Sequence, residues 1–416
     1  LRPSVRYSNG RLFNAEAFAK NIAYLKSEEA QRYVISGEVR TIKSAKPLDE
    51  LTVEIEPYAP DVLLPRRLGM IPMPEPYLYN EMGPEIFSMA PVGTGSYMVE
   101  NWNLESQRPI LLSNETSWRA PVEIDRVEMR MVKDVGTQVH ALLAGEADIS
   151  YNYGVVDIET LEAAGFRTVL RPGGQIMSLA FSNRDPNSPF ADQRVRQALN
   201  YAVDVQAIAD IIMMGTTQPV GQPGIETMTG HNPSVSPYPY DPEKARVLLA
   251  EAGYADGFSF RAEVLVGAAA ESTPMYLKVA QDLTAVGVNM EVQPLQGSSW
   301  IRKYFSGEWD EADVISATWN GASYWDVVRA IEIFSCNKPG AFFCLPNMTQ
   351  VIDGTHGIFD ADKRERTLQD LSKQMHDLAP ALFLVQLVDI VSVNPRYASL
   401  PFRHKQLAID QLRLKQ

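Results

Sequence analysis

Residues 192–204 read DQRVRQALNYAVD and residues 238–253 read YPYDPEKARVLLAEAG, and these two stretches decide the fold class. The first places apolar residues at i, i+3, i+4 and i+7, the spacing of one helix face: Val195, Ala198, Leu199 and Ala202. This stripe predicts a helix over 194–212. The second stretch predicts a helix that begins with Asp241 as its N-cap, continues into a proline, and ends at Gly253.

Strand patterns alternate with helix patterns on both sides of these stretches. Short apolar or alternating runs predict strands at 176–181, 258–264, 288–292, 313–316 and 382–393. Helical spacing predicts further helices at 136–143, 275–286 and 362–378. The alternation predicts an α/β protein, and a length of 416 residues is too long for one ordinary core, which favours two or more lobes.

Charge and hydropathy exclude several partners. The formal net charge is -13, which argues against nucleic acid because phosphate binding needs clustered Lys and Arg. No apolar run approaches the ~20 residues that cross a bilayer, and the longest candidate, 379–393, is broken by Gln386 and Asp389. The opening Leu1-Arg2-Pro3 is not a signal peptide, so we expect a mature chain, a truncated chain, or both.

The two cysteines lie close together. Cys336 and Cys344 flank a Pro-Gly turn signal, so they form either a disulfide or two unrelated buried thiols. A metal site is not expected, because there is no C-x-x-C and the five His residues are scattered.

Catalytic motifs are missing from the sequence. It has no G-x-S-x-G elbow, no H-E-x-x-H and no P-loop, and the Gly-Thr-Gly at 93–95 lacks the third glycine of a dinucleotide site. We therefore assign no catalytic residue and expect no cofactor. A hydrolase would need a nucleophile–base pair, which we do not find.

An aromatic and polar cluster supplies the candidate binding residues. Residues 317–326 read ATWNGASYWD and follow a predicted strand, and the loop after a strand is where α/β lobes usually bind ligands. Rings supply flat contact area, while amide and hydroxyl groups supply orientation. The candidates are Trp319, Asn320, Gly321, Ala322, Ser323 and Tyr324, with Asp326 weaker. The alternative is that Trp319 and Trp325 are core aromatics beside a loop.

Four segments, in order, carry a family resemblance. They are residues 1–16 (LRPSVRYSNGRLFNAE), residues 91–97 (PVGTGSY) and the two stretches quoted first. In these segments the sequence resembles the periplasmic solute-binding proteins of ABC importers, in the dipeptide, oligopeptide and nickel class called family 5. The last two match D-x-R-V-R-Q-A-L-x-Y-A-I-D and Y-x-Y-D-P-E-K-A-K-x-L-L-x-E-A-G. The matches span the whole chain.

The resemblance implies a two-lobed binder with an extra subdomain, hinged by two strands near 176–183 and 384–391. It implies that 1–90 form the extra subdomain, 91–183 the proximal lobe and 184–385 the distal lobe, with 386–416 returning to the proximal lobe. Gly174 and Gln175, before the first hinge strand, are further ligand-binding candidates. The family normally has a stretch before residues 1–16, which would supply the first strands of the proximal lobe.

The loop at 319–326 resembles the dipeptide binders' W-x-G-D loop, which is followed by F-S-C, here residues 334–336. Cys336 and Cys344 then resemble that subfamily's disulfide. The acid that would hold a peptide's α-ammonium is replaced by Ala322, and Asp326 lies further along as a possible substitute. An uncharged loop fits a polyol, a sugar or a phosphate at least as well as a peptide, and the resemblance adds opines, sugar phosphates and oligosaccharides as ligands of related members.

The predicted function is therefore that of a periplasmic or extracytoplasmic binding component of an ABC importer, and not of an enzyme. Its expected partners are a small-molecule or peptide ligand and an inner-membrane permease, and we expect a monomer whose lobes close over the ligand. The alternative is a ligand-sensing receptor or chaperone of the same fold.

Overall fold

The computed structural model describes residues 1–102, 108–132, 134–151, 154–267, 270–309, 311–337, 341–403 and 406–415. The chain divides into two compact units. Unit 1 contains residues 1–134 and 395–416, and unit 2 contains residues 135–394. Lobe boundaries at 90, 183 and 385 stay a prediction. No helix among the described residues combines the length and apolar content that a bilayer span requires.

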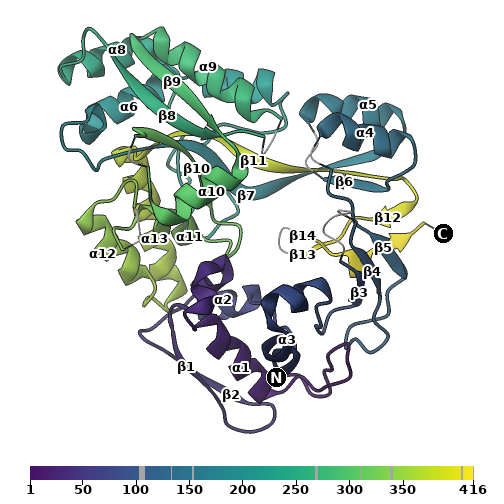
Figure 1. Cartoon of the computed structure of the whole chain (residues 1–416). Coiled ribbons are helices and arrows are strands. Elements are labelled where there is room, and N and C mark those ends of the chain that lie inside the picture. The colour runs from purple at the N-terminus through teal and green to yellow at the C-terminus, as the bar shows by residue number, and fades with distance from the viewer. Residues whose placement is uncertain are drawn as a thin grey trace. The chain divides into compact units, whose positions relative to one another are not determined.

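Unit 1 is built from small sheets and short helices (Figure 1). Its helices are α1 (Ala15–Leu25), α2 (Leu64–Met70) and α3 (Pro76–Met89). Two hairpins pair β1 (Ile42–Pro47) with β2 (Val53–Pro57), and β13 (Phe402–Arg403) with β14 (Gln406–Leu407). A three-stranded sheet has the strand order β3 (Tyr97–Asn101), β4 (Ile110–Ser113), β5 (Arg126–Glu128). A separate pair is formed by β12 (Tyr397–Ser399) and β15 (Arg413–Leu414).

Unit 2 is organised around one six-stranded sheet of order β6-β11-β7-β10-β8-β9. The strands are β6 (Ile149–Tyr151), β7 (Arg167–Phe181), β8 (Phe258–Leu265), β9 (Val288–Leu295), β10 (Val314–Asn320) and β11 (Ala381–Val393). The two long strands β7 and β11 are antiparallel neighbours, while β10, β8 and β9 run parallel to one another (Figure 1).

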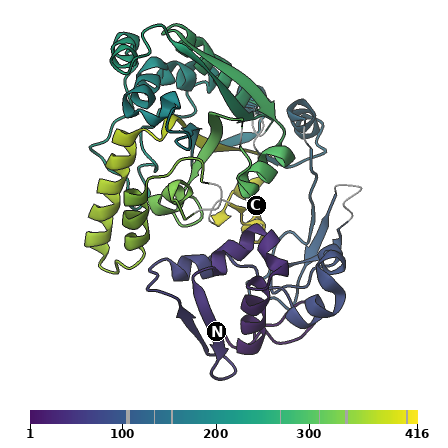
Figure 2. The ribbon, with the colours of Figure 1, turned by 60° about the vertical axis from the view of Figure 1, so that its left-hand side comes forward.

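Unit 2 also contains α-helices, several of which pack against this sheet. They are α4 (Val135–Leu143), α5 (Ile158–Ala163), α6 (Gln193–Ala202), α7 (Val205–Ala207), α8 (Pro242–Glu251), α9 (Ser272–Thr284), α10 (Gly297–Ser306), α11 (Val327–Ile331), α12 (Pro346–Thr355) and α13 (Ala361–Leu378). Helices α12 and α13 lie side by side (Figure 2). The predicted apolar stripe of α6 is fully buried in the core of unit 2.

Two predicted elements differ from the structure. The helix predicted over 194–212 is interrupted at Val203, whose backbone is extended. The Asp204 side chain then accepts the Ala207 N–H and starts a new helical turn, because a short acidic side chain competes for free backbone donors. The strand predicted to end at Ser316 continues to Asn320, because β7 pairs with it along its full length.

Candidate ligand-binding site

The pairing of β7 with β10 brings the two predicted binding segments together. Asn320 lies opposite Gln175 in the antiparallel register. One residue further on, the Gly321 N–H donates to the Gly174 carbonyl oxygen over 3.2 Å. Gly174 and Gln175, proposed from one part of the sequence, therefore lie beside the loop proposed from another.

Glycine is required at two positions of this contact. Gly174 has φ +66°, and a Cβ there would lie 2.9 Å from both the Met228 Cε and the Trp325 ring. A Cβ at Gly321 would lie 2.7 Å from the Met228 Sδ. A larger residue at position 174 would push the loop away from β7, whereas one at position 321 would displace Met228 or the Asp326 backbone.

The loop folds into a tight turn around one carbonyl group. The Gly321 carbonyl oxygen accepts N–H groups from Tyr324, Trp325 and Asp326 at 3.2, 2.8 and 3.4 Å. Trp325 has φ 53°, a left-handed conformation that costs a bulky residue on the order of 1–3 kcal/mol. Thr229 supports the strained residue, because its N–H donates to the Trp325 carbonyl oxygen at 3.2 Å. The turn is therefore held by several contacts at once.

Asp326 ties the end of the loop to two helices. Its side chain is 0% exposed. Its Oδ1 accepts the Val328 N–H at 3.0 Å and caps α11, and its Oδ2 accepts from the Arg364 Nη1 at 2.6 Å. Arg364 belongs to α13 and is also buried, so this carboxylate already has a cation and a backbone donor as partners.

Trp319 is a core aromatic residue, the alternative that the sequence left open. Its ring is fully buried and lies between Phe334 and Phe383, with ring centroids 4.2 and 5.3 Å away. Its Nε1 has no hydrogen-bond partner among the described residues. Ala322 and Tyr324 are buried as well. Ligand contact by Trp319, Ala322 or Tyr324 stays a prediction, and it would require the loop to open.

The accessible part of the candidate site is an uncharged polar edge. Gln175, Asn320 and Ser323 are partly exposed. Asn320 also shapes the turn, since its Oδ1 accepts the Ala322 N–H at 3.2 Å. Carboxamide and hydroxyl groups both donate and accept hydrogen bonds, so this edge suits a polar ligand without demanding a charge.

A disulfide lies next to the aromatic residues of the site. Cys336 and Cys344 are bonded, with their Cα atoms 5.1 Å apart, which confirms the pairing implied by the resemblance. Asn183, just after β7, fastens this loop: its Nδ2 donates to the Cys344 carbonyl oxygen at 2.7 Å, and its Oδ1 accepts the Cys344 N–H at 3.0 Å. Phe343 inside the disulfide loop lies edge-on to Phe334, with ring centroids 6.2 Å apart, and Trp319 stacks on Phe334.

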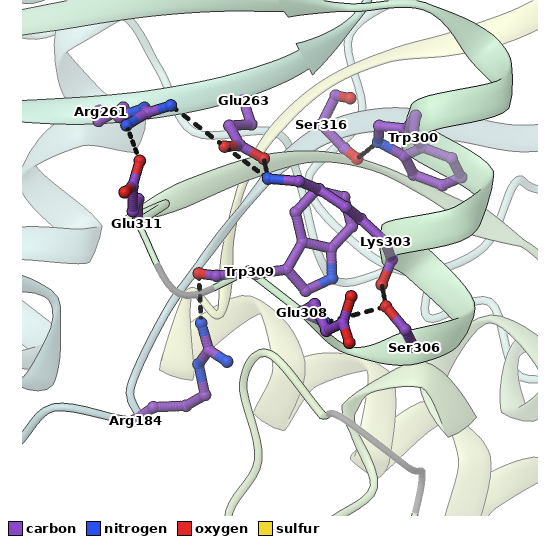
Figure 3. A network of polar contacts seen from close by, with 10 residues as sticks. All are labelled: Arg184, Arg261, Glu263, Trp300, Lys303, Ser306, Glu308, Trp309, Glu311 and Ser316. Atoms are coloured by element: carbon purple, nitrogen blue, oxygen red, sulfur yellow. Dashed lines mark hydrogen bonds and ion pairs between the residues drawn. The ribbon is translucent and has the colours of Figure 1, made fainter.

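A polar network that the sequence analysis did not single out fixes the base of β10 (Figure 3). Lys303 on α10 donates to both carboxylate oxygens of the buried Glu263 on β8, at 2.8 and 2.7 Å. The Trp300 indole N–H donates to the Ser316 carbonyl oxygen on β10 at 3.2 Å. Trp300 and Tyr304 stack at the i, i+4 spacing, which is the signal that could have revealed this helix face.

Comparison with known proteins assigns this fold and this loop to a family. The family model for bacterial extracellular solute-binding proteins, family 5 (middle part), matches residues 1–341. The chain belongs to this family. The resemblance stated from the sequence is thereby confirmed, and so is the fold class.

Relatives of this solute-binding protein differ in what their names say they bind. Heme-binding protein A of Haemophilus influenzae is 26% identical over 87% of this chain and 68% of its own length. The nickel-binding periplasmic protein of Escherichia coli is 24% identical over 97% of this chain and 80% of its own length. A glutathione-binding protein of Pectobacterium atrosepticum is 31% identical over 62% of this chain, which is half the length of that relative.

Solved structures agree on the fold of this solute-binding protein. The binding protein AgaA in complex with agropinic acid, from A. tumefaciens R10, has a TM-score of 0.85 at 18% identity and covers 100% of this chain and 86% of its own. The ABC transporter-associated periplasmic binding protein DppA from Helicobacter pylori, in complex with the peptide STSA, has a TM-score of 0.83 at 20% identity, over 98% and 83%. These neighbours are binding proteins, which is the class of function that the sequence predicted for this chain.

Proposed function

We propose that this chain is the extracytoplasmic binding component of an ABC importer, and that it captures a small polar solute whose bound end carries no free ammonium group. Sugars, opines and sugar phosphates are the solute classes that fit. The solute would contact the edge formed by Gln175, Asn320 and Ser323. An inner-membrane permease would receive it from a monomeric binding protein in the periplasm.

One observation carries this proposal: no carboxylate is available at the loop. The loop resembles the W-x-G-D loop of dipeptide binders, with Ala322 in place of the acid. Asp326, the remaining acid of the loop, is buried against Arg364 at 2.6 Å and caps α11. A buried ammonium group without a carboxylate partner is strongly unfavourable, so a free peptide N-terminus is a poor ligand here.

The fold of this chain does not by itself select peptides as ligands. The same fold holds agropinic acid in one neighbour and a peptide in another. The site residues therefore decide the ligand, and in this chain the accessible ones are neutral.

Calorimetry on the purified chain tests this proposal. The panel contains di- and tripeptides, N-acetylated peptides, oligosaccharides, opines and sugar phosphates. We expect a member of the last three classes to bind at least tenfold more tightly than any peptide with a free N-terminus. Tight binding of free peptides, lost on N-acetylation, would refute the proposal.

A gain-of-function variant sharpens the test. Ala322→Asp restores the missing carboxylate, so we expect it to bind free dipeptides at least tenfold more tightly than the wild-type chain. Ala322→Asn has nearly the same size without the charge and is the matched control. If both variants change the affinity for free dipeptides equally, the volume of the side chain at position 322, and not its charge, determines that affinity.

A further inference from the structure

We propose that unit 2 holds a second solute site, for an uncharged, hydroxyl-rich molecule, in a cavity beside β11. The cavity has a volume of about 530 Å³, within the range of roughly 300–1,000 Å³ that is usual for small-molecule sites. Its lining comes from residues 204–206, 218–240 and Gln386, all of which lie in unit 2. The cavity is therefore formed by unit 2 alone.

One wall of the cavity is an extension of the sheet. The Val220 N–H donates to the Leu384 carbonyl oxygen at 2.9 Å, and the Gln386 N–H donates to the Gln218 carbonyl oxygen at 3.2 Å. Between these bonds, Pro219 forms an antiparallel bridge with Val385. Backbone pairing thus fixes this wall to the edge of β11.

The rest of the lining comes from a long loop, which contacts within the loop and with α13 hold in place. Gln222 is buried, its Oε1 accepts the Asn232 N–H at 2.8 Å, and its Nε2 donates to the Asn232 carbonyl oxygen at 2.9 Å. The Tyr238 hydroxyl donates to the His376 carbonyl oxygen, and the two rings stack at 4.2 Å. Because these groups are occupied with each other, the loop is preformed around the cavity.

Gln386 is the observation that points to a ligand. Residues 381–385 before it are all apolar and buried, and Gln386 is itself only 8% exposed. Its side chain lines the cavity and has no hydrogen-bond partner among the described residues. Its amide oxygen and nitrogen are not enclosed by protein, so they face the open space of the cavity, where a polar molecule can exchange hydrogen bonds with them.

The other lining side chains define the chemical class of that molecule. Gln206 and Gln218 add carboxamides, and Asp204 and Glu226 add carboxylates, while no Lys or Arg is found among the described residues that line the cavity. Burial lowers the pKa of the lining His231 below its ordinary value, so this ring is neutral at pH 7. An anion would find no counter-charge here, whereas hydroxyl groups can donate to the carboxylates and exchange hydrogen bonds with the amides.

Flat faces complete the match to a hydroxylated ring. Tyr240 is half exposed at the cavity, whose lining also includes three prolines: Pro219, Pro237 and Pro239. Rigid rings of this kind supply apolar contact at a small entropic cost. Carboxamides and carboxylates beside flat apolar faces suit a sugar or a polyol.

The cavity and the accessible edge of the loop site have no residue in common, although they lie close together on the sheet. Gln386 lies opposite Ile176 in the pairing of β11 with β7, and the next residue, Leu387, lies opposite Gln175 of the loop site. Separate variants can therefore address the two sites.

Calorimetry of the full chain with glucose, galactose, maltose, sucrose and sorbitol tests the second site. Glucose 6-phosphate and spermidine are the charged comparators. We expect one of the uncharged probes to bind, and Gln386→Leu to weaken that binding at least tenfold. Gln386→Leu should unfold at the same temperature as the wild type or higher, because it removes a buried polar group without changing volume much.

Two further variants separate this binding from the loop site. Tyr240→Ala removes an exposed ring and should weaken the same probe, while Ala322→Asp should leave its affinity unchanged. The proposal is overturned if no uncharged probe binds, if only a charged comparator binds, or if the bound probe is lost in Ala322→Asp and kept in Gln386→Leu.

Discussion

The buried pair of Asp326 and Arg364 gives the sharpest test of how the candidate loop is built. The carboxylate is 0% exposed, the guanidinium side chain is 8% exposed, and the Oδ2–Nη1 distance is 2.6 Å. Removing one partner of such a pair leaves a buried charge uncompensated and costs about 3–5 kcal/mol. Losing the N-cap of α11 adds about 1 kcal/mol. We therefore expect Asp326→Ala to lower the free energy of unfolding by about 4–6 kcal/mol.

Asp326→Asn separates the two contributions. Asparagine caps helices about as well as aspartate, so this variant should lose the ion pair alone and be about 1 kcal/mol more stable than Asp326→Ala. Adding Arg364→Met to Asp326→Asn should recover much of the loss, because no unpaired charge is then buried. Asp377→Ala, in the exposed pair with Lys373, is the control and should cost less than 1 kcal/mol.

Urea unfolding, followed by tryptophan fluorescence and circular dichroism, measures these differences. If Asp326→Asn costs no more than Asp377→Ala, the carboxylate is not a structural tie. If that variant also lost affinity for free peptides, Asp326 would have the ammonium-binding role after all. The claim that the loop has no available carboxylate would then fail.

Three further changes probe the same unit. Trp319→Ala should lower the free energy of unfolding by about 3–5 kcal/mol, because the ring lies between two aromatic rings in the core. Urea unfolding measures this loss, and a loss below about 1 kcal/mol would contradict the packing of Trp319 between Phe334 and Phe383. Reducing the bond between Cys336 and Cys344 should cost about 2–3 kcal/mol in the same assay, and a Cys336→Ser, Cys344→Ser double variant should then be insensitive to reductant. Burial lowers the pKa of His376 below 6.5, so the unfolded chain binds the proton more readily. Its contribution to stability is present above about pH 6.5 and is lost as the pH falls through the folded-state pKa. His376→Gln should flatten that slope in thermal melts between pH 7.5 and 5.

Local signals in the sequence located most of the elements of unit 2. Asp241 caps α8 as predicted, with its side chain accepting the Lys244 N–H at 2.9 Å, and Gly253 ends the helix in a left-handed conformation. Both signals depend only on neighbouring residues. The break at Val203 was not predicted, because an aspartate at position 204 is compatible both with the polar face of one continuous helix and with the N-cap of a second helix.

The candidate site was harder to predict because its contacts join distant residues. The loop at 319–326 and the segment Gly174–Gln175 were found from composition and position, and the structure places them side by side. The burial of Trp319 was left open, since a ring at a strand end can face the core or a ligand. The partner of Asp326 could not be predicted, because Arg364 is 38 residues away on another helix.

Strand β11 contains two polar residues within an apolar run, and they have different surroundings in the fold. Gln386 and Asp389 interrupt an apolar run that is otherwise suited to a buried strand, and their polarity argued against a membrane span. In the folded chain Asp389 lies opposite Arg171 on β7, with a carboxylate oxygen 3.9 Å from a guanidinium nitrogen. Gln386 has no such partner and lines the cavity. In the proposal above, this carboxamide is the group through which the cavity binds its solute.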